Sequence, residues 1–199
     1  MAPEIDPKFR AFRFAICGTH YTGKTTLCHE VVSRLLRRGI SVAFAAEPSR
    51  TSRYLAAGIR GFATQLELFA GTISTEVEAA RSSDIVICDR SLLDVLAYTD
   101  ALGDPGTRYH VNLRDAMTAF ADVYMKTYDG VFKTAWRFDM EQSKDSLRVD
   151  GAEFQDLIDQ RICYHAHRLG ITMIHLEEID TAATVVESHV LRSLQSRRS

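Results

Sequence analysis

Two glycines, a lysine and a threonine stand near the start of the chain at a spacing suited to holding phosphate. The stretch reads Gly18, Thr19, His20, Tyr21, Thr22, Gly23, Lys24, Thr25 and fits the pattern G-x-x-x-x-G-K-[ST]. Glycines allow a tight turn that aims successive backbone N–H groups at one point, which suits a di- or triphosphate. The lysine ammonium would then reach the outer phosphates, and the threonine hydroxyl would bind Mg²⁺.

The segments on either side of this turn are the ones that such a site needs. An apolar run at 12–17 predicts a buried strand, and the apolar spacing of Leu27, Val31 and Leu35 predicts a helix over 26–38. The positive end of that helix would favour an anion at the turn. We therefore interpret the turn as a P-loop that binds ATP or GTP together with Mg²⁺. The residues expected to contact the nucleotide are Gly18, His20, Tyr21, Thr22, Gly23, Lys24, Thr25 and Thr26.

Four further strand-like runs follow along the chain, at 41–46, 85–89, 130–134 and 171–176. Segments with helical spacing separate them, and strands that alternate with helices form a parallel sheet covered on both faces. One later helix is expected to open on a capping box of Asp150 and Glu153 and to end at Gly170, and the last is expected from Thr181 to about 194. The pattern predicts an α/β fold with a doubly wound, five-stranded parallel sheet and helices on both faces.

Composition sets limits on the class of protein. The chain has 199 residues, of which 46% are apolar and 25% charged, so we expect one domain over 1–199. The net charge of −2 supplies no global positive field, so nucleic acid is not favoured as a partner, although a local basic patch that binds it is possible.

The first residues resemble no signal peptide, and no apolar run is long enough for a membrane span, so we expect a cytoplasmic protein. Homodimer formation is left open. Cysteines with no metal or redox spacing are expected to be buried, reduced thiols, namely Cys17, Cys28, Cys88 and Cys163.

Acidic residues close the second and third predicted strands. Glu47 follows the run at 41–46, and Asp89 ends the run at 85–89 and precedes Arg90. Because the carboxyl ends of the strands line the ligand crevice of a doubly wound sheet, both carboxylates are expected to face the phosphates. Asp89 suits a magnesium ligand, with a helix N-cap as the alternative. Glu47 suits a general base, with a surface carboxylate as the alternative, and Arg90 is placed to neutralise a phosphoryl group in transfer.

A polar segment at 136–150 joins the fourth strand to the helix after it. It is long for a connection inside a compact domain, and such loops are often lids. Its basic residues, Arg137, Lys144 and Arg148, stand among acidic ones. We expect a lid over 136–150, with a solvated charged connector as the alternative.

Together these motifs resemble the P-loop kinases of nucleosides and nucleotides. Deoxynucleoside kinases carry Glu-Pro after the second strand and Glu-Arg-Ser after the third, where this chain has Glu47-Pro48 and Asp89-Arg90-Ser91. Thymidylate kinases carry Asp-Arg and then Ala-Tyr, as this chain does at 89–90 and 97–98.

The overall resemblance is strongest to the AAA-type ATPase and kinase group that includes the ribosylnicotinamide kinase domain. Members have a similar Asp-Gly-Val-Phe strand, here at 129–132, and a lid with an Arg and an Asp before a helix, here Arg148 and Asp150. The resemblance spans roughly residues 12–178. It implies that Glu47 is the base or substrate-hydroxyl ligand, that Asp89 is the magnesium ligand, and that Arg90 and Arg148 clamp phosphate.

Contacts to a second substrate are expected from the helical segment after Glu47. Gln65 resembles the base-reading Gln of deoxynucleoside kinases, since an amide offers both a donor and an acceptor to a base edge. A solvent-facing Gln is the alternative. Arg50 would bind a substrate phosphate or face solvent, and Asp94, near the site entrance, would take a ribose or base hydrogen bond.

The sequence thus predicts an ATP- and Mg²⁺-dependent kinase with Lys24, Glu47, Asp89, Arg90 and Arg148 as its catalytic residues. The expected phosphoryl acceptor is a nucleoside- or nucleotide-like small molecule. Two alternatives stay open, a kinase that acts on a nucleic-acid end or modified base and a regulatory P-loop NTPase without a second substrate.

Overall fold

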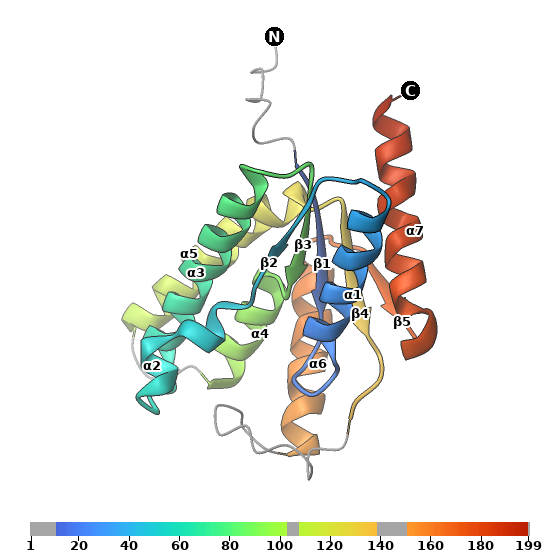
Figure 1. The fold of residues 1–199 in the computed structure, drawn as a ribbon. Helices are drawn as coiled ribbons and strands as arrows, with labels where there is room; N and C mark the ends of the chain where they lie inside the picture. Colours follow the sequence, from blue (N-terminus) through green and yellow to red (C-terminus); the bar gives the residue numbers. More distant parts are fainter. Residues whose placement is uncertain (1–10, 103–107, 139–150, 199) are drawn as a thin grey trace.

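The computed structural model describes residues 11–102, 108–138 and 151–198, with a sheet of five parallel strands at the centre (Figure 1). The strand order is β2-β3-β1-β4-β5. The bounds are β1 (Phe12–Cys17), β2 (Val42–Ala45), β3 (Ile85–Asp89), β4 (Gly130–Thr134) and β5 (Met173–Leu176). The predicted doubly wound sheet is confirmed, with the second and fifth strands shorter than expected. Because β1 is central, the turn after it lies between the ends of β3 and β4.

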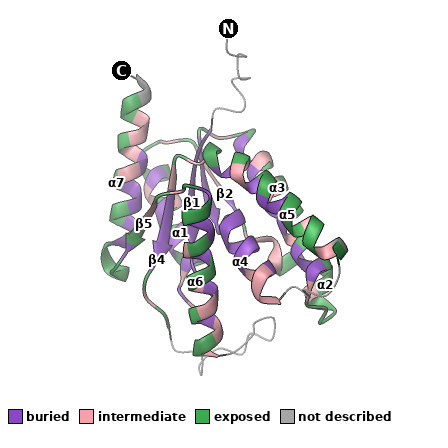
Figure 2. Ribbon diagram, turned by 180° about the vertical axis from the view of Figure 1, so that it is seen from behind, coloured by how far each residue is buried: buried purple, intermediate pink, exposed green. Residues whose placement is uncertain are grey.

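Helices cover both faces of the sheet. One face packs against α1 and α7 through strand side chains such as Phe14, Ile87 and Phe132. The other face packs against α3, α4, α5 and α6 through smaller side chains such as Ala15 and Val131. The two sets alternate along the strands, as the pleat requires, and Figure 2 shows exposed residues on the outer sides of the helices. The helical bounds are α1 (Lys24–Arg37), η2 (Pro48–Thr51), α2 (Arg53–Ala56), α3 (Phe62–Ala80), α4 (Leu92–Leu102), α5 (Arg108–Tyr124), η3 (Met125–Thr127), α6 (Ala152–Arg168) and α7 (Ile179–Arg198).

Two helix starts differ from expectation. α1 begins at Lys24, inside the glycine-rich motif, rather than at 26. α6 has Gly151 as its N-cap, with φ 131° and no side-chain cap bond, so the predicted capping box does not open it. Asp150 itself lies outside the described residues. Three of the four free cysteines are buried as expected, and Cys163 is half-buried.

A carboxylate lies inside the core on the α3 side of the sheet. Glu76 accepts hydrogen bonds from the hydroxyls of Tyr124, at 3.0 Å, and Tyr128, at 2.5 Å. Burial raises the pKa of Glu76 to about 7, and the two hydroxyl donors act in the opposite direction. The contact ties α3 to the end of α5.

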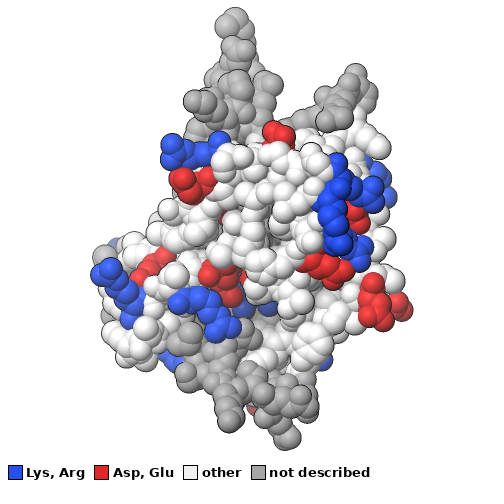
Figure 3. All heavy atoms as spheres, viewed as in Figure 1, with Lys and Arg blue, Asp and Glu red and all other residues white. Residues whose placement is uncertain are grey.

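The charged surface is mixed. Arg38 Nε lies 2.6 Å from Glu187 Oε1, which links α1 to α7, and Figure 3 shows basic side chains in separate groups with acidic ones beside them. None of the helices in the described part of the chain is long and apolar enough to cross a membrane.

Candidate active site

The turn between β1 and α1 has a backbone that only its glycines can adopt without strain. Gly18 has φ 143° and Gly23 has φ 69°, and Tyr21 also lies in the left-handed region with φ 56°. A Cβ on Gly18 would collide with Thr134 Oγ1 of β4, and a Cβ on Gly23 would come within 2.8 Å of the Phe138 ring. Conformation therefore favours glycine at both positions, and at Gly18 the space beside Thr134 requires it as well.

Lys24 turns its ammonium back into the turn. Nζ donates to the carbonyl oxygen of Thr19 and to Thr22 Oγ1, at 3.2 Å, and the residue is buried. Burial and then the charge of Arg90 lower the pKa of Lys24 to about 8, against the opposing effect of nearby carboxylates. Among the described residues, this buried ammonium contacts one carbonyl and one hydroxyl and no charged partner. Phosphate oxygens would supply one.

Thr25 and Asp89 form the part of the site that suits a magnesium ion. Thr25 Oγ1 donates to Asp89 Oδ2 at 2.5 Å, while Asp89 Oδ1 is buried without a hydrogen-bond partner among the described residues. Burial, and next the charge of Glu47, raise the pKa of Asp89. A divalent cation would satisfy the orphaned oxygen and offset both effects. The described residues hold no group of three or more His, Cys, Asp or Glu that could bind a metal, so water and phosphate oxygens would complete the Mg²⁺ shell, as this ion prefers.

Glu47 and Arg90 form an ion pair between the ends of β2 and β3. Arg90 Nε lies 2.7 Å from Glu47 Oε1, and Arg90 has φ 80°, a strained value that persists only where the surroundings enforce it. Burial acts to raise the pKa of Glu47, but the charges of Arg90 and Lys24 outweigh it, and the pKa of this carboxyl is lowered. Glu47 is therefore ionised at neutral pH and able to accept a proton.

Arg90 is held from several sides. Besides Glu47, its Nη1 donates to the Gly18 carbonyl at 2.9 Å, and its guanidinium lies 5.3 Å from the Tyr98 ring centroid. The residue was expected to clamp phosphate. In this structure the guanidinium holds Glu47 and the start of the turn, and its contact with phosphate stays a prediction.

Asp94 lines the hollow between α3 and α4, as its expected place by the second substrate requires, but its carboxylate bonds within the protein. It is fully buried, with Oδ1 accepting from Gly18 N at 3.0 Å and from Arg90 Nη1 at 3.3 Å. Oδ2 accepts from the backbone N and the hydroxyl of Ser91. The Ser91 hydroxyl in turn accepts from Leu93 N, so Ser91 and Asp94 form the capping box of α4. All four acceptor positions of the carboxylate are occupied. Asp94 is therefore a positioning residue, and the alternative of Asp89 as the cap of this helix is wrong.

Two hollows meet at Glu47. The P-loop hollow is lined by 21–26, Asp89 and Phe138, and the α3–α4 hollow lies between η2, α3 and α4. Both are lined by Glu47, Arg50 and Arg90. Of the residues expected to contact nucleotide, 21–26 line the P-loop hollow, whereas Gly18 and His20 do not.

The α3–α4 hollow has an apolar wall with a few polar groups. Its apolar side chains are Leu55, Leu68, Val95 and Leu102. Gln65 is buried, and its Oε1 has no hydrogen-bond partner among the described residues. His20 also lines this hollow, with Nδ1 3.1 Å from the Tyr98 hydroxyl. A mostly apolar cleft with a few convergent polar groups is the usual form of a small-molecule site.

Helix α6 anchors the turn from its other side through residues that the sequence analysis did not assign. Asp159 Oδ1 accepts from Thr19 N at 3.3 Å and from buried Lys133 at 3.0 Å. Asp159 Oδ2 accepts from Arg137 at 2.8 Å, and Gln155 Nε2 donates to the His20 carbonyl at 3.0 Å. Their partners are distant in sequence, so no local pattern pointed to them. The predicted lid is described only over 136–138, and Arg148 lies outside the described residues.

Comparisons with known proteins agree with this architecture. A family model described as an AAA domain matches residues 13–183. No curated protein matches the chain. A crystal structure of NadR protein in complex with NAD and AMP-PNP is similar with a TM-score of 0.65 and 14% identity, covering 93% of this chain and 50% of that one. A second, of NadR protein in complex with NR, gives a TM-score of 0.67 and 14% identity, covering 93% and 52%. The chain thus spans about half the length of these NadR chains, and the likeness is one of fold. Since the family model covers most of the sequence, the chain belongs to this AAA-domain family of P-loop NTPases.

Proposed function

We propose that the protein is a kinase that uses ATP or GTP with Mg²⁺ to transfer the γ-phosphoryl group to a nucleoside- or nucleotide-like small molecule. The observation that carries the proposal is that the P-loop hollow and the α3–α4 hollow share Glu47, Arg50 and Arg90. A triphosphate in the first hollow and an acceptor in the second would meet at these side chains. An NTPase that only hydrolyses nucleotide needs no second hollow at that point.

The chemistry follows from the charges around the meeting point. The acceptor oxygen forms a bond to the γ-phosphorus while the bond from that phosphorus to the β–γ bridging oxygen breaks. Glu47, ionised because of Arg90 and Lys24, accepts the proton of an acceptor hydroxyl. Lys24 and the backbone N–H groups of the turn neutralise charge on the phosphate oxygens. Bound at Thr25 and Asp89, Mg²⁺ would add charge neutralisation between the outer phosphates.

The nature of the acceptor is inferred from the α3–α4 hollow. Its apolar wall suits the flat face of a ring, and the orphaned Gln65 Oε1 requires a hydrogen-bond donor from whatever binds there. The NadR structures contain NR, NAD and AMP-PNP, which supports an acceptor of nucleoside type. Arg50, which lines both hollows, is proposed to contact phosphate.

The test is a phosphoryl-acceptor screen with γ-labelled ATP and GTP across nucleosides, nucleotides and oligonucleotides. The proposal predicts label transfer to a small molecule, and the same transfer should fall when Gln65 is changed to Leu. Gln195→Leu, on α7 and outside both hollows, is the matched control. Transfer only to oligonucleotide ends would favour the nucleic-acid kinase instead. Hydrolysis that no acceptor stimulates would reject a kinase and favour a regulatory NTPase.

A further inference from the structure

Phe138 places a half-exposed aromatic ring at one end of the P-loop hollow. The residue follows β4, is 49% exposed and lines the hollow together with residues of the turn. Its backbone N–H donates to the Tyr21 carbonyl at 2.7 Å, and its ring lies against Gly23. The backbone of Phe138 is therefore tied to the turn, while about half of the residue's surface is exposed.

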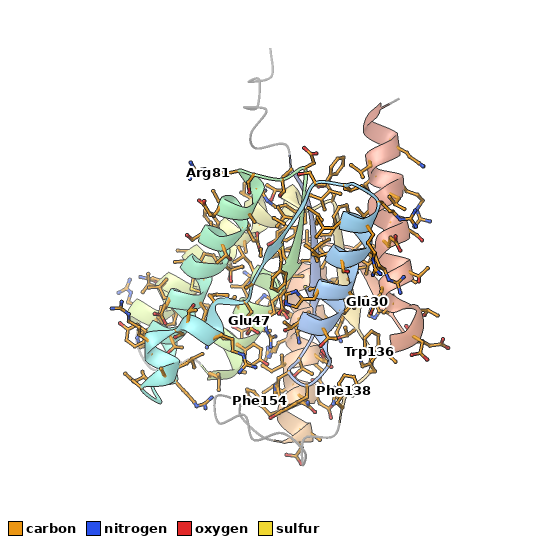
Figure 4. All side chains as sticks on the ribbon, in the orientation of Figure 1. Glu30, Glu47, Arg81, Trp136, Phe138 and Phe154 are labelled. Atoms are coloured by element: carbon orange, nitrogen blue, oxygen red, sulfur yellow. The ribbon has the colours of Figure 1, made fainter. Side chains whose placement is uncertain are left out.

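The topology of the sheet decides which part of a nucleotide comes near this ring. Glu47 follows β2 and Asp89 ends β3, on one side of β1, whereas Phe138 follows β4 on the other side. Figure 4 shows Glu47 toward β2 and Phe138 beside the turn that precedes α1. The γ-phosphate has to lie at the Glu47 end, where the two hollows meet. The nucleoside of a triphosphate held along the turn then extends toward the opposite end.

We propose that Phe138 is the platform on which the base of the nucleoside triphosphate stacks. A half-exposed aromatic ring beside a phosphate-binding turn can bind a base through its π-face, and such stacking tolerates different bases. The inference rests on the nucleotide binding that the proposed function requires, and it is independent of the acceptor. It adds a base contact to a site whose other described contacts all concern phosphate and Mg²⁺.

The experiment compares nucleotides with a triphosphate that has no base. Equilibrium binding of ATP, GTP and inorganic tripolyphosphate, each with Mg²⁺, is measured by calorimetry for wild type, Phe138→Leu and Phe138→Trp. Phe138→Leu should weaken ATP and GTP by about tenfold, within the range found when a stacking ring is removed, and leave tripolyphosphate unchanged. Phe138→Trp should restore nucleotide affinity. Phe120→Leu on α5, 46% exposed and outside the P-loop hollow, serves as the control and should bind all three as wild type does.

Two outcomes would overturn the inference alone. An equal loss of ATP and tripolyphosphate affinity in Phe138→Leu would mean that the ring only shapes the turn. Unchanged ATP and GTP affinity would place the base elsewhere. A wild-type protein that binds none of the three ligands would overturn the proposed function as well, which separates that failure from the first two.

Discussion

We expect Lys24 to make nucleotide binding depend on pH above neutrality. Its pKa is lowered from the usual 10.5 to about 8, mainly by burial and next by the charge of Arg90. The depression corresponds to about 3 kcal/mol, which is the order of the cost of keeping this ammonium charged in the unliganded site. Bound phosphates add negative charge around Nζ and return the pKa toward its usual value. Nucleotide binding is therefore strong only when Lys24 is already protonated or when it takes up a proton from solution as the nucleotide binds.

The size of the effect follows from the protonated fraction of the free protein. Below pH 8 most molecules carry the charged lysine, and at pH 9 only about one in ten does, so the affinity for ATP should fall by about tenfold between pH 7 and pH 9. Over the same range Glu47 stays ionised because its pKa is lowered. The buried thiols of Cys17 and Cys28 have pKa values raised well above 9 and stay neutral.

Calorimetry in buffers of different ionisation enthalpy measures both the affinity and the number of protons taken up. We expect proton uptake near zero at pH 7 that approaches one at pH 9. Lys24→Arg, which keeps a cation that does not titrate, should remove the uptake. A flat affinity from pH 7 to pH 9.5 in wild type, or uptake that persists in Lys24→Arg, would refute the assignment of this titration to Lys24.

Four further predictions concern single carboxylates. Glu47→Gln should leave ATP affinity nearly intact and lower single-turnover transfer to a hydroxyl acceptor by about 10²–10⁴-fold, and an unchanged rate would remove Glu47 from proton transfer. Asp89→Asn should shift the Mg²⁺ dependence of activity to higher concentration while urea unfolding stays cooperative, and an identical Mg²⁺ titration would contradict the ligand role. Asp159→Ala should lower the free energy of unfolding by about 3 kcal/mol because it strands the buried Lys133 ammonium, and adding Lys133→Met should recover part of that loss. Glu76, with a pKa of about 7 when folded and a lower value when unfolded, releases its proton more readily from the unfolded chain, so stability should fall as pH rises from about 4.5 to 7. Glu76→Gln should flatten that slope in urea titrations, and an equal slope in both proteins would contradict the cause given.

Local sequence predicted the elements well because the signals are themselves local. The buried strands β1 and β3 are continuous apolar runs, and the glycines and lysine of the P-loop occur at fixed spacing. The two strands and the P-loop could therefore be predicted from the sequence alone. β2 is shorter than its predicted run by one residue at each end, and β5 begins two residues later than its run, because strand pairing and not apolar character sets the bounds of a strand. The cap of α6 was misassigned because a capping pattern also occurred one residue before the true start.

The site was predicted less completely because its supporting contacts are long-range. Asp94 bonds to Gly18, 76 positions away, and Asp159 bonds to Thr19, 140 positions away. Neither pairing leaves a pattern in sequence, since an acidic residue on a helix has no local sign of its partner. The motif also could not indicate that His20 lines the α3–α4 hollow and not the P-loop hollow, because this depends on how the surrounding chain packs.

The capping box of Asp94 has a consequence for how such a protein can change over generations. One buried carboxylate binds both the first residue of the P-loop and the first turn of α4. A substitution that shifts either segment therefore also disturbs the other. η2 and α2, which supply part of the α3–α4 hollow, share none of the hydrogen bonds described for that carboxylate. Apart from Arg50 and Thr51, which also line the P-loop hollow, residues there can change without disturbing the groups expected to hold phosphate. In a chain organised in this way, substitutions that alter acceptor recognition and substitutions that alter phosphate binding fall mostly on different segments. New acceptor preferences are expected to arise first in residues 48–60.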